Sequence, residues 1–243
     1  MAPSLTATLA IDMGAIPSDF RHCAKNIWFT LSILALVISL WLDIGTEAYW
    51  LLHQEVVDPF ELFSKAMSGN GSVISLPLLA SLPCAASAWQ ELNAGAARLA
   101  VFRCGRFTYI TGKLISVLIM AALAQVIGLL FFLGMLMMIC PVADTPFPGL
   151  VLLARLLTVM FFSAVGGAGA LVAKDAVSAY AIPIALCFAL SMISSRFLIS
   201  VRLANPLNWL KGDPQAIGLL ILLIVSASVI YVTSLRLVMK QYV

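Results

Sequence analysis

One charged segment, residues 91–113, carries most of the chemistry that this sequence offers. It reads ELNAGAARLAVFRCGRFTYITGK and places one acidic and four basic residues between two long apolar runs: Glu91, Arg98, Arg103, Arg106 and Lys113. Such side chains form ion pairs and charge-assisted hydrogen bonds with carboxylates or phosphates. In a chain with 62% hydrophobic and only 10% charged residues, this concentration of charge predicts a short helix that a partner protein can bind.

Residues that could form a catalytic centre are not found together in the sequence. The only histidines, His22 and His53, are expected on opposite sides of a membrane, so they cannot share a metal site or a catalytic triad. Gly112-Lys113 does not complete a phosphate-binding loop, because the upstream glycine is too distant and Leu114 stands where Ser or Thr must meet magnesium. We therefore expect no catalytic residue, metal or cofactor on this chain.

Two polar residues fall inside apolar runs, Gln125 and Arg155. We expect Arg155 to snorkel toward the outer interface and Gln125 to hydrogen-bond a neighbouring helix, so both are read as structural. None of the eleven acidic residues lies deep in an apolar run, which argues against a proton- or sodium-driven carrier.

Membrane-spanning helices are the elements that must position these residues. The mean hydropathy of +1.06 predicts an all-α integral membrane protein with six transmembrane helices, a single domain over residues 27–243. The expected spans are 27–42, 72–88, 114–140, 149–173, 176–192 and 216–235. Prolines 77, 83 and 183 should kink or interrupt their helices.

The distribution of basic residues predicts the orientation. With the N-terminus inside, nine basic residues fall on the cytoplasmic side and five outside, so both termini are expected in the cytoplasm, in a bacterial plasma membrane. Residues 1–26 should form a cytoplasmic segment with an amphipathic interfacial helix, and residues 43–70 an acidic outer loop. The net charge of +3 does not indicate a nucleic-acid partner, and the five scattered cysteines do not predict disulfides.

The fourth expected span contains a run of small residues, including Ser163, Gly166, Gly167 and Gly169. Small side chains let another helix backbone approach closely. The sequence leaves two interpretations open: packing within the chain, or an interface with a second subunit.

The spacing of Glu91, Gly95, Arg106 and Lys113 resembles the signature of the ABC-2 family of ABC-exporter permeases. The six-span plan and the Asn205-Pro206-Leu207-Asn208-Trp209 element ahead of the last span are also similar to that family. This sequence departs from the family pattern at Ala96, where Thr is common, and at Cys104-Gly105, where a Pro-x-Ser turn is frequent.

The resemblance implies a permease subunit that moves an amphipathic peptide, drug or lipid. A separate ATP-binding subunit would carry ATP and Mg, and a second permease subunit would complete a homo- or heterodimer in contact with membrane lipid. The segment between spans two and three would be the coupling helix to the ATPase, using Glu91, Gly95, Arg98, Arg103, Arg106 and Lys113. The alternatives are a non-transporting membrane protein (an immunity, sensor or scaffold protein) and then a passive channel.

Overall fold

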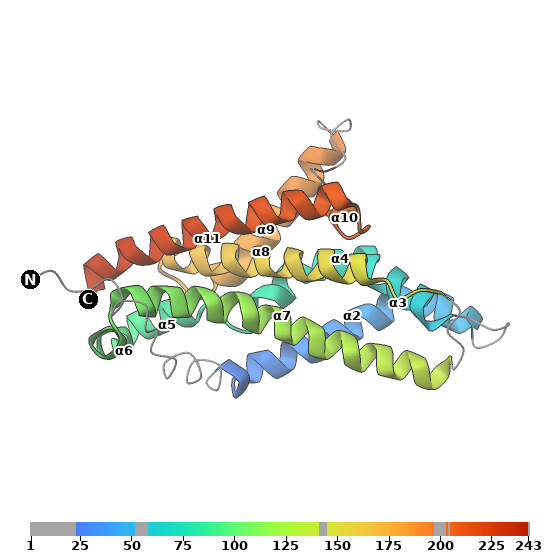
Figure 1. Ribbon diagram of the computed structural model, residues 1–243, viewed down its shortest axis with the longest axis horizontal. Coiled ribbons are helices and arrows are strands. Elements are labelled where there is room, and N and C mark those ends of the chain that lie inside the picture. The colour runs from blue at the N-terminus through green and yellow to red at the C-terminus, as the bar shows by residue number, and fades with distance from the viewer. Residues whose placement is uncertain (1–22, 52–57, 141–144, 197–202, 204, 243) are drawn as a thin grey trace, which may run out of the picture.

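The fold is built from helices and turns. The computed structural model describes residues 23–51, 58–140, 145–196, 203 and 205–242, and these contain no strand. In chain order the helices are α2 (Ile27–Leu51), α3 (Pro59–Ser68), α4 (Asn70–Ser81), α5 (Ser87–Asn93), α6 (Ala96–Cys104), α7 (Arg106–Ile139), α8 (Gly149–Ala173), α9 (Ser178–Arg196), α10 (Pro206–Trp209) and α11 (Pro214–Tyr242). Most of the long helices run along one axis, whereas α9 leans away from the bundle (Figure 1).

Five helices in the described residues are long and apolar enough to cross a membrane: α2, α7, α8, α9 and α11. They turn large apolar side chains outward, such as Leu42 at 78% exposure and Leu222 at 69%. Such a surface is stable in lipid and costly in water. The chain is therefore a multi-span helical membrane protein.

The second predicted span, residues 72–88, is not one continuous helix. Helix α4 has 12 residues and is about 18 Å long, which is shorter than the hydrocarbon core of about 30 Å. A turn over residues 82–86 contains Pro83 and leads into α5. The predicted interruption by proline is thus confirmed at Pro83, whereas Pro77 and Pro183 lie inside α4 and α9.

Helix α8 lies at the centre of the bundle, and its small residues make that position possible. An added Cβ at Gly167 would lie 2.6 Å from the Tyr231 ring of α11, and one at Gly169 would lie 2.7 Å from Ile182 of α9. Ser163 Oγ donates a hydrogen bond to the Val117 carbonyl of α7 at 3.1 Å. Together with Gly166, these residues are buried against helices of the same chain, so the packing interpretation accounts for the whole run.

The last turn of α11 lies at the same end of the bundle as α5 and α6, and α2 begins in the same half of the bundle but nearer its middle (Figure 1). Cys23, just ahead of α2, contacts Cys84 in the turn before α5. The Trp89 ring of α5 lies 5.8 Å from the Tyr242 ring of α11, edge to face. We call this end the basic end, and α3 lies at the other (Figure 1).

Two further sequence predictions concern segments that the structure describes only in part. The interfacial helix expected within residues 1–26 lies mostly outside them. The predicted acidic outer loop, in contrast, contains α3, which begins at Pro59 after the N-cap residue Asp58. The Asp58 side chain accepts a hydrogen bond from Phe60 N at 2.8 Å, and Pro59 occupies the first helical turn.

Candidate functional site

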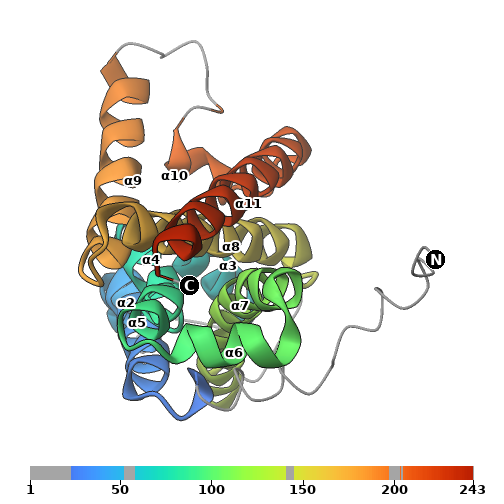
Figure 2. The same ribbon diagram turned by 90° about the vertical axis from the view of Figure 1, so that its left-hand side faces the viewer.

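Helix α6 crosses the basic end of the bundle, between α5 and α7 (Figure 2). Its nine residues, AARLAVFRC, are mostly good helix formers. A glycine with positive φ bounds each end, Gly95 at 75° and Gly105 at 80°. Such backbone angles suit glycine and strain other residues. The two glycines therefore allow a sharp turn at each end of α6.

The outer surface of α6 is both apolar and basic. Phe102 is 88% exposed and Leu99 is 65% exposed, and Arg103 is exposed beside them. Arg98 is also exposed, and its Nε donates a hydrogen bond to the Tyr242 carbonyl of α11 at 2.6 Å. Exposed aromatic and arginine side chains together are typical of protein contact surfaces.

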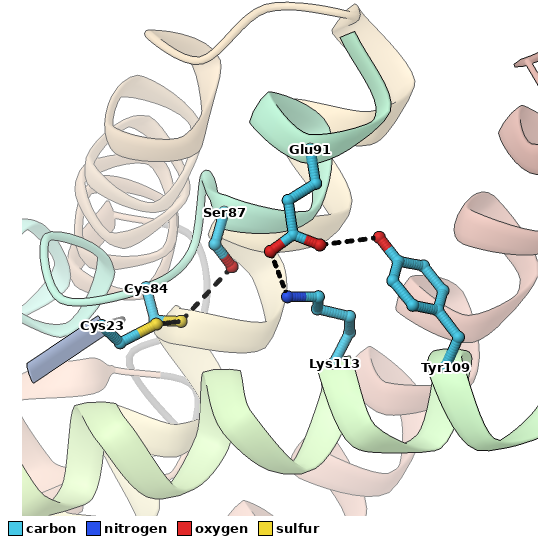
Figure 3. A network of polar contacts seen from close by, with 6 residues as sticks. All are labelled: Cys23, Cys84, Ser87, Glu91, Tyr109 and Lys113. Atoms are coloured by element: carbon cyan, nitrogen blue, oxygen red, sulfur yellow. Dashed lines mark hydrogen bonds and ion pairs between the residues drawn. The ribbon is translucent and has the colours of Figure 1, made fainter. Parts of the chain in front are cut away.

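Behind α6, an ion pair joins α5 to α7. Lys113 Nζ of α7 donates to Glu91 Oε1 of α5, and Tyr109 Oη donates to the other carboxylate oxygen at 3.2 Å (Figure 3). The Lys113 side chain is 3% exposed and that of Glu91 29%. A buried ammonium is stable only with an acceptor of opposite charge, so this pair fixes the distance between the two helices.

A cavity of about 270 Å³ lies next to the ion pair and is lined in part by Glu91, Lys113 and Tyr180. Cys23 and Cys84 also line this cavity, and Cys84 Sγ lies 3.3 Å from Ser87 Oγ (Figure 3). Within the described ranges, no group of three or more His, Cys, Asp or Glu side chains could hold a metal ion.

The structure divides the six residues of the predicted coupling segment into three sets. Gly95, Arg98 and Arg103 belong to α6 or its first turn, whereas Glu91 and Lys113 face each other inside the bundle. Arg106 opens α7 and is exposed, away from that pair. At Gly95, an added Cβ would meet nothing within 4 Å, so the positive φ explains the glycine within this chain.

Sequence reasoning missed two residues of this region. Tyr109 precedes Lys113 by four residues in α7, which places both on one helix face, and this spacing could have identified it. Tyr242 lies far away in the sequence from the Arg98 that it binds, and no spacing rule connects them.

A second polar cluster surrounds Arg155 in α8, at the opposite half of the bundle. The prediction that Arg155 snorkels to the interface is wrong, because its side chain is 0% exposed. Its Nη1 donates to the Met67 carbonyl and to Ser72 Oγ, both at 2.7 Å. Its Nε donates to Gln125 Oε1 at 3.3 Å, which confirms the predicted interhelical hydrogen bond of Gln125. Arg155 therefore links α3, α4 and α7 to α8.

Comparison with family models, with curated proteins and with solved structures finds no match to this chain. The interpretation of the site therefore depends on its residues and their geometry.

Proposed function

We propose that this chain is the transmembrane permease subunit of an ATP-driven ABC exporter of the ABC-2 type. The observation that carries the proposal is α6, a short helix between two glycine turns that exposes Phe102 and Arg103 at the basic end. A separate ATPase would receive this helix and would bind ATP and Mg. The cargo would be an amphipathic peptide, drug or lipid, moved by two permease subunits together.

The contacts behind α6 would transmit a displacement of α6 to the membrane helices. A partner that moves α6 also moves α5 and α7, because the Glu91–Lys113 ion pair joins those two helices. Arg98 extends the connection to the end of α11. Rigid helices linked by charge-assisted bonds move as a body, which favours a displacement of whole helices over local bending.

The proposal includes six crossings of the membrane, with α4, the Pro83 turn and α5 as the second. Helix α2 begins in the half of the bundle that contains the basic end, and α11 ends there, and an even number of crossings brings a chain back to its starting side. Both of these ends would lie in the cytoplasm, where the ATPase is. The small residues of α8 are covered within the chain, so the second permease would contact other faces.

Affinity purification from native membranes tests the coupling role. We expect the intact chain to retain an ATPase, and the double variant Phe102→Ala/Arg103→Glu to lose about tenfold or more of it, as is usual for central contact residues. The matched control is Phe188→Ala/Arg196→Glu, which makes the same changes at exposed positions of α9. The control should retain the ATPase fully.

Two results would count against this function. If no ATPase accompanies the intact chain, the non-transporting alternative becomes the better account. If the ATPase is retained equally by both double variants, α6 is not the contact helix. ATP hydrolysis by the purified chain, free of every partner, would contradict the assignment of that activity to a separate subunit.

A further inference from the structure

A basic pocket lies between the first turn of α7 and the last turns of α11. It has a volume of about 270 Å³ and is lined by three basic and three apolar residues: Arg106, Phe107, Ile110, Arg236, Met239 and Lys240. The two helices run in opposite directions, so the beginning of one lies beside the end of the other (Figures 1 and 2). None of the residues that carry α6's proposed contact lines this pocket.

The three cations of the pocket lack an acidic partner among the described residues. Arg106, Arg236 and Lys240 are all exposed, and no ion pair joins them to a described carboxylate. The two described acids at this end are engaged elsewhere, Glu91 with Lys113 and Asp175 with the Ser178 backbone. Three like charges around one pocket repel each other, and a bound anion relieves that repulsion.

The apolar half of the pocket indicates where the anion comes from. Phe107 is 68% exposed, and Leu237, which lies outside the pocket lining but next to Arg236, is 63% exposed. Both belong to helices that are long and apolar enough to cross a membrane, and both lie near an end of their helix. An anion that carries acyl chains satisfies both halves of the pocket, the phosphate with the cations and the chains with the exposed apolar side chains.

We propose that this pocket binds the headgroup phosphate of an anionic phospholipid of the phosphatidylglycerol class. Arg106 contacts the phosphate from α7, while Arg236 and Lys240 contact it from α11. Residues 236 and 240 are four apart and share one helix face, so both reach the same phosphate. The bound lipid ties α7 to α11 at the end where α6 is held, and this role is independent of exporter activity.

Native mass spectrometry of the purified full chain measures the binding. The chain in nonionic detergent is titrated with phosphatidylglycerol and with phosphatidylcholine that carries the same acyl chains. We expect selective retention of phosphatidylglycerol. In Arg236→Gln/Lys240→Gln its affinity should fall about 25-fold, since each basic residue near an anionic lipid contributes about a factor of five. The charge-conserving Arg236→Lys/Lys240→Arg should retain binding.

Matched controls and competitors decide what the pocket binds. Arg103→Gln on α6 and Lys211→Gln, both at exposed positions outside the pocket, should leave the lipid selectivity unchanged. Inorganic phosphate alone should not displace the lipid at equal concentration. For the unaltered chain, added salt should weaken binding of phosphatidylglycerol but not of phosphatidylcholine. This last measurement applies even where the glutamine variant fails to fold.

Five results would overturn the proposal. Equal retention of the two lipids would remove the selectivity for an anion, as would salt-insensitive binding of phosphatidylglycerol. Equal affinity in the glutamine variant would place the lipid elsewhere. Displacement by inorganic phosphate would make this a site for the free anion. If Arg236→Gln/Lys240→Gln binds the lipid as before but loses a co-purifying ATPase, the cations belong to a protein contact.

Discussion

Lys113 and Arg155 are the two basic side chains that the described part of the chain buries, and their hydrogen-bond partners differ in kind. Lys113 is a compact charge and meets the carboxylate of Glu91. The planar guanidinium of Arg155 instead donates to a carbonyl, a hydroxyl and an amide on three other helices. Each burial therefore fixes a contact between helices, one at each half of the bundle.

Replacing Glu91 with Gln tests whether the ion pair holds α5 to α7. The change keeps the shape of the side chain but leaves the Lys113 ammonium, which is 3% exposed, without its counter-charge. We expect the free energy of unfolding to fall by about 1–3 kcal/mol, the range for a buried polar group that loses its partner. Because Glu91 itself is 29% exposed, the lower half of that range applies. Thermal unfolding in detergent measures the change.

Glu61→Gln is the matched control, since Glu61 pairs with Lys65 on the surface of α3 and both side chains are more than half exposed. Such pairs contribute little, so we expect a change of about 0–1 kcal/mol. Equal destabilisation by the two substitutions would show that the burial of Lys113 does not depend on Glu91. The exchange Glu91→Lys/Lys113→Glu should recover part of the lost stability.

At the residue scale, the sequence identified both members of this pair but not their contact. Glu91 and Lys113 are the charged residues at the two ends of the segment, and both were expected to face a partner protein. The Gly95 and Gly105 turns reverse the chain between them, and a periodic pattern cannot predict such a reversal. Arg155 was similarly misplaced, because its acceptors lie on segments far away in the sequence.

At the element scale, apolar runs located five long helices, including both ends of α8, but missed several ends of the other four. Helix α7 was expected from residue 114 but begins at Arg106, and α11 was expected to end at 235 but continues to Tyr242. Hydropathy marks only the part of a helix that lies in lipid, whereas the backbone continues to hydrogen-bond beyond it. Helix α3 was missed although Asp58-Pro59 is a recognisable helix start.

The turn at Gly105 gives a prediction for α6. Gly105 has φ 80° and ψ 157°, a region in which any side chain is strained by about 1–3 kcal/mol. We expect Gly105→Ala to loosen the C-terminal turn of α6, and trypsin should then cleave after Arg103 and Arg106 several times faster. The control Gly134→Ala lies inside α7 with nothing within 4 Å of its Cβ, and should be neutral or stabilising by about 1 kcal/mol. Unchanged cleavage in Gly105→Ala would mean that the turn relaxes without cost.

At the scale of the whole molecule, the broken α4–α5 segment decides the topology. Gly71 N and Ser72 N donate to the Asp43 carboxylate at 2.9 and 2.5 Å, so α4 begins beside the far part of α2. Helix α5 ends at the basic end, where α6 starts (Figure 1). The segment thus travels the length of the bundle although neither helix could cross a membrane alone. Proline composition predicted the break, but only the packing of both pieces shows that the segment runs from one end of the bundle to the other.

Cysteine labelling in intact cells tests this topology. On a background without the five native cysteines, Lys65→Cys in α3 should react with an impermeant maleimide, and Leu99→Cys in α6 should react only after permeabilisation. Both positions are exposed in the structure, so access to solvent does not differ between them and the membrane alone separates their reactivity. If α4–α5 did not cross, α3 and α6 would lie on one side and both cysteines would label together. The reverse pattern, with Leu99→Cys reactive from outside, would invert the molecule and place the basic end away from any cytoplasmic ATPase.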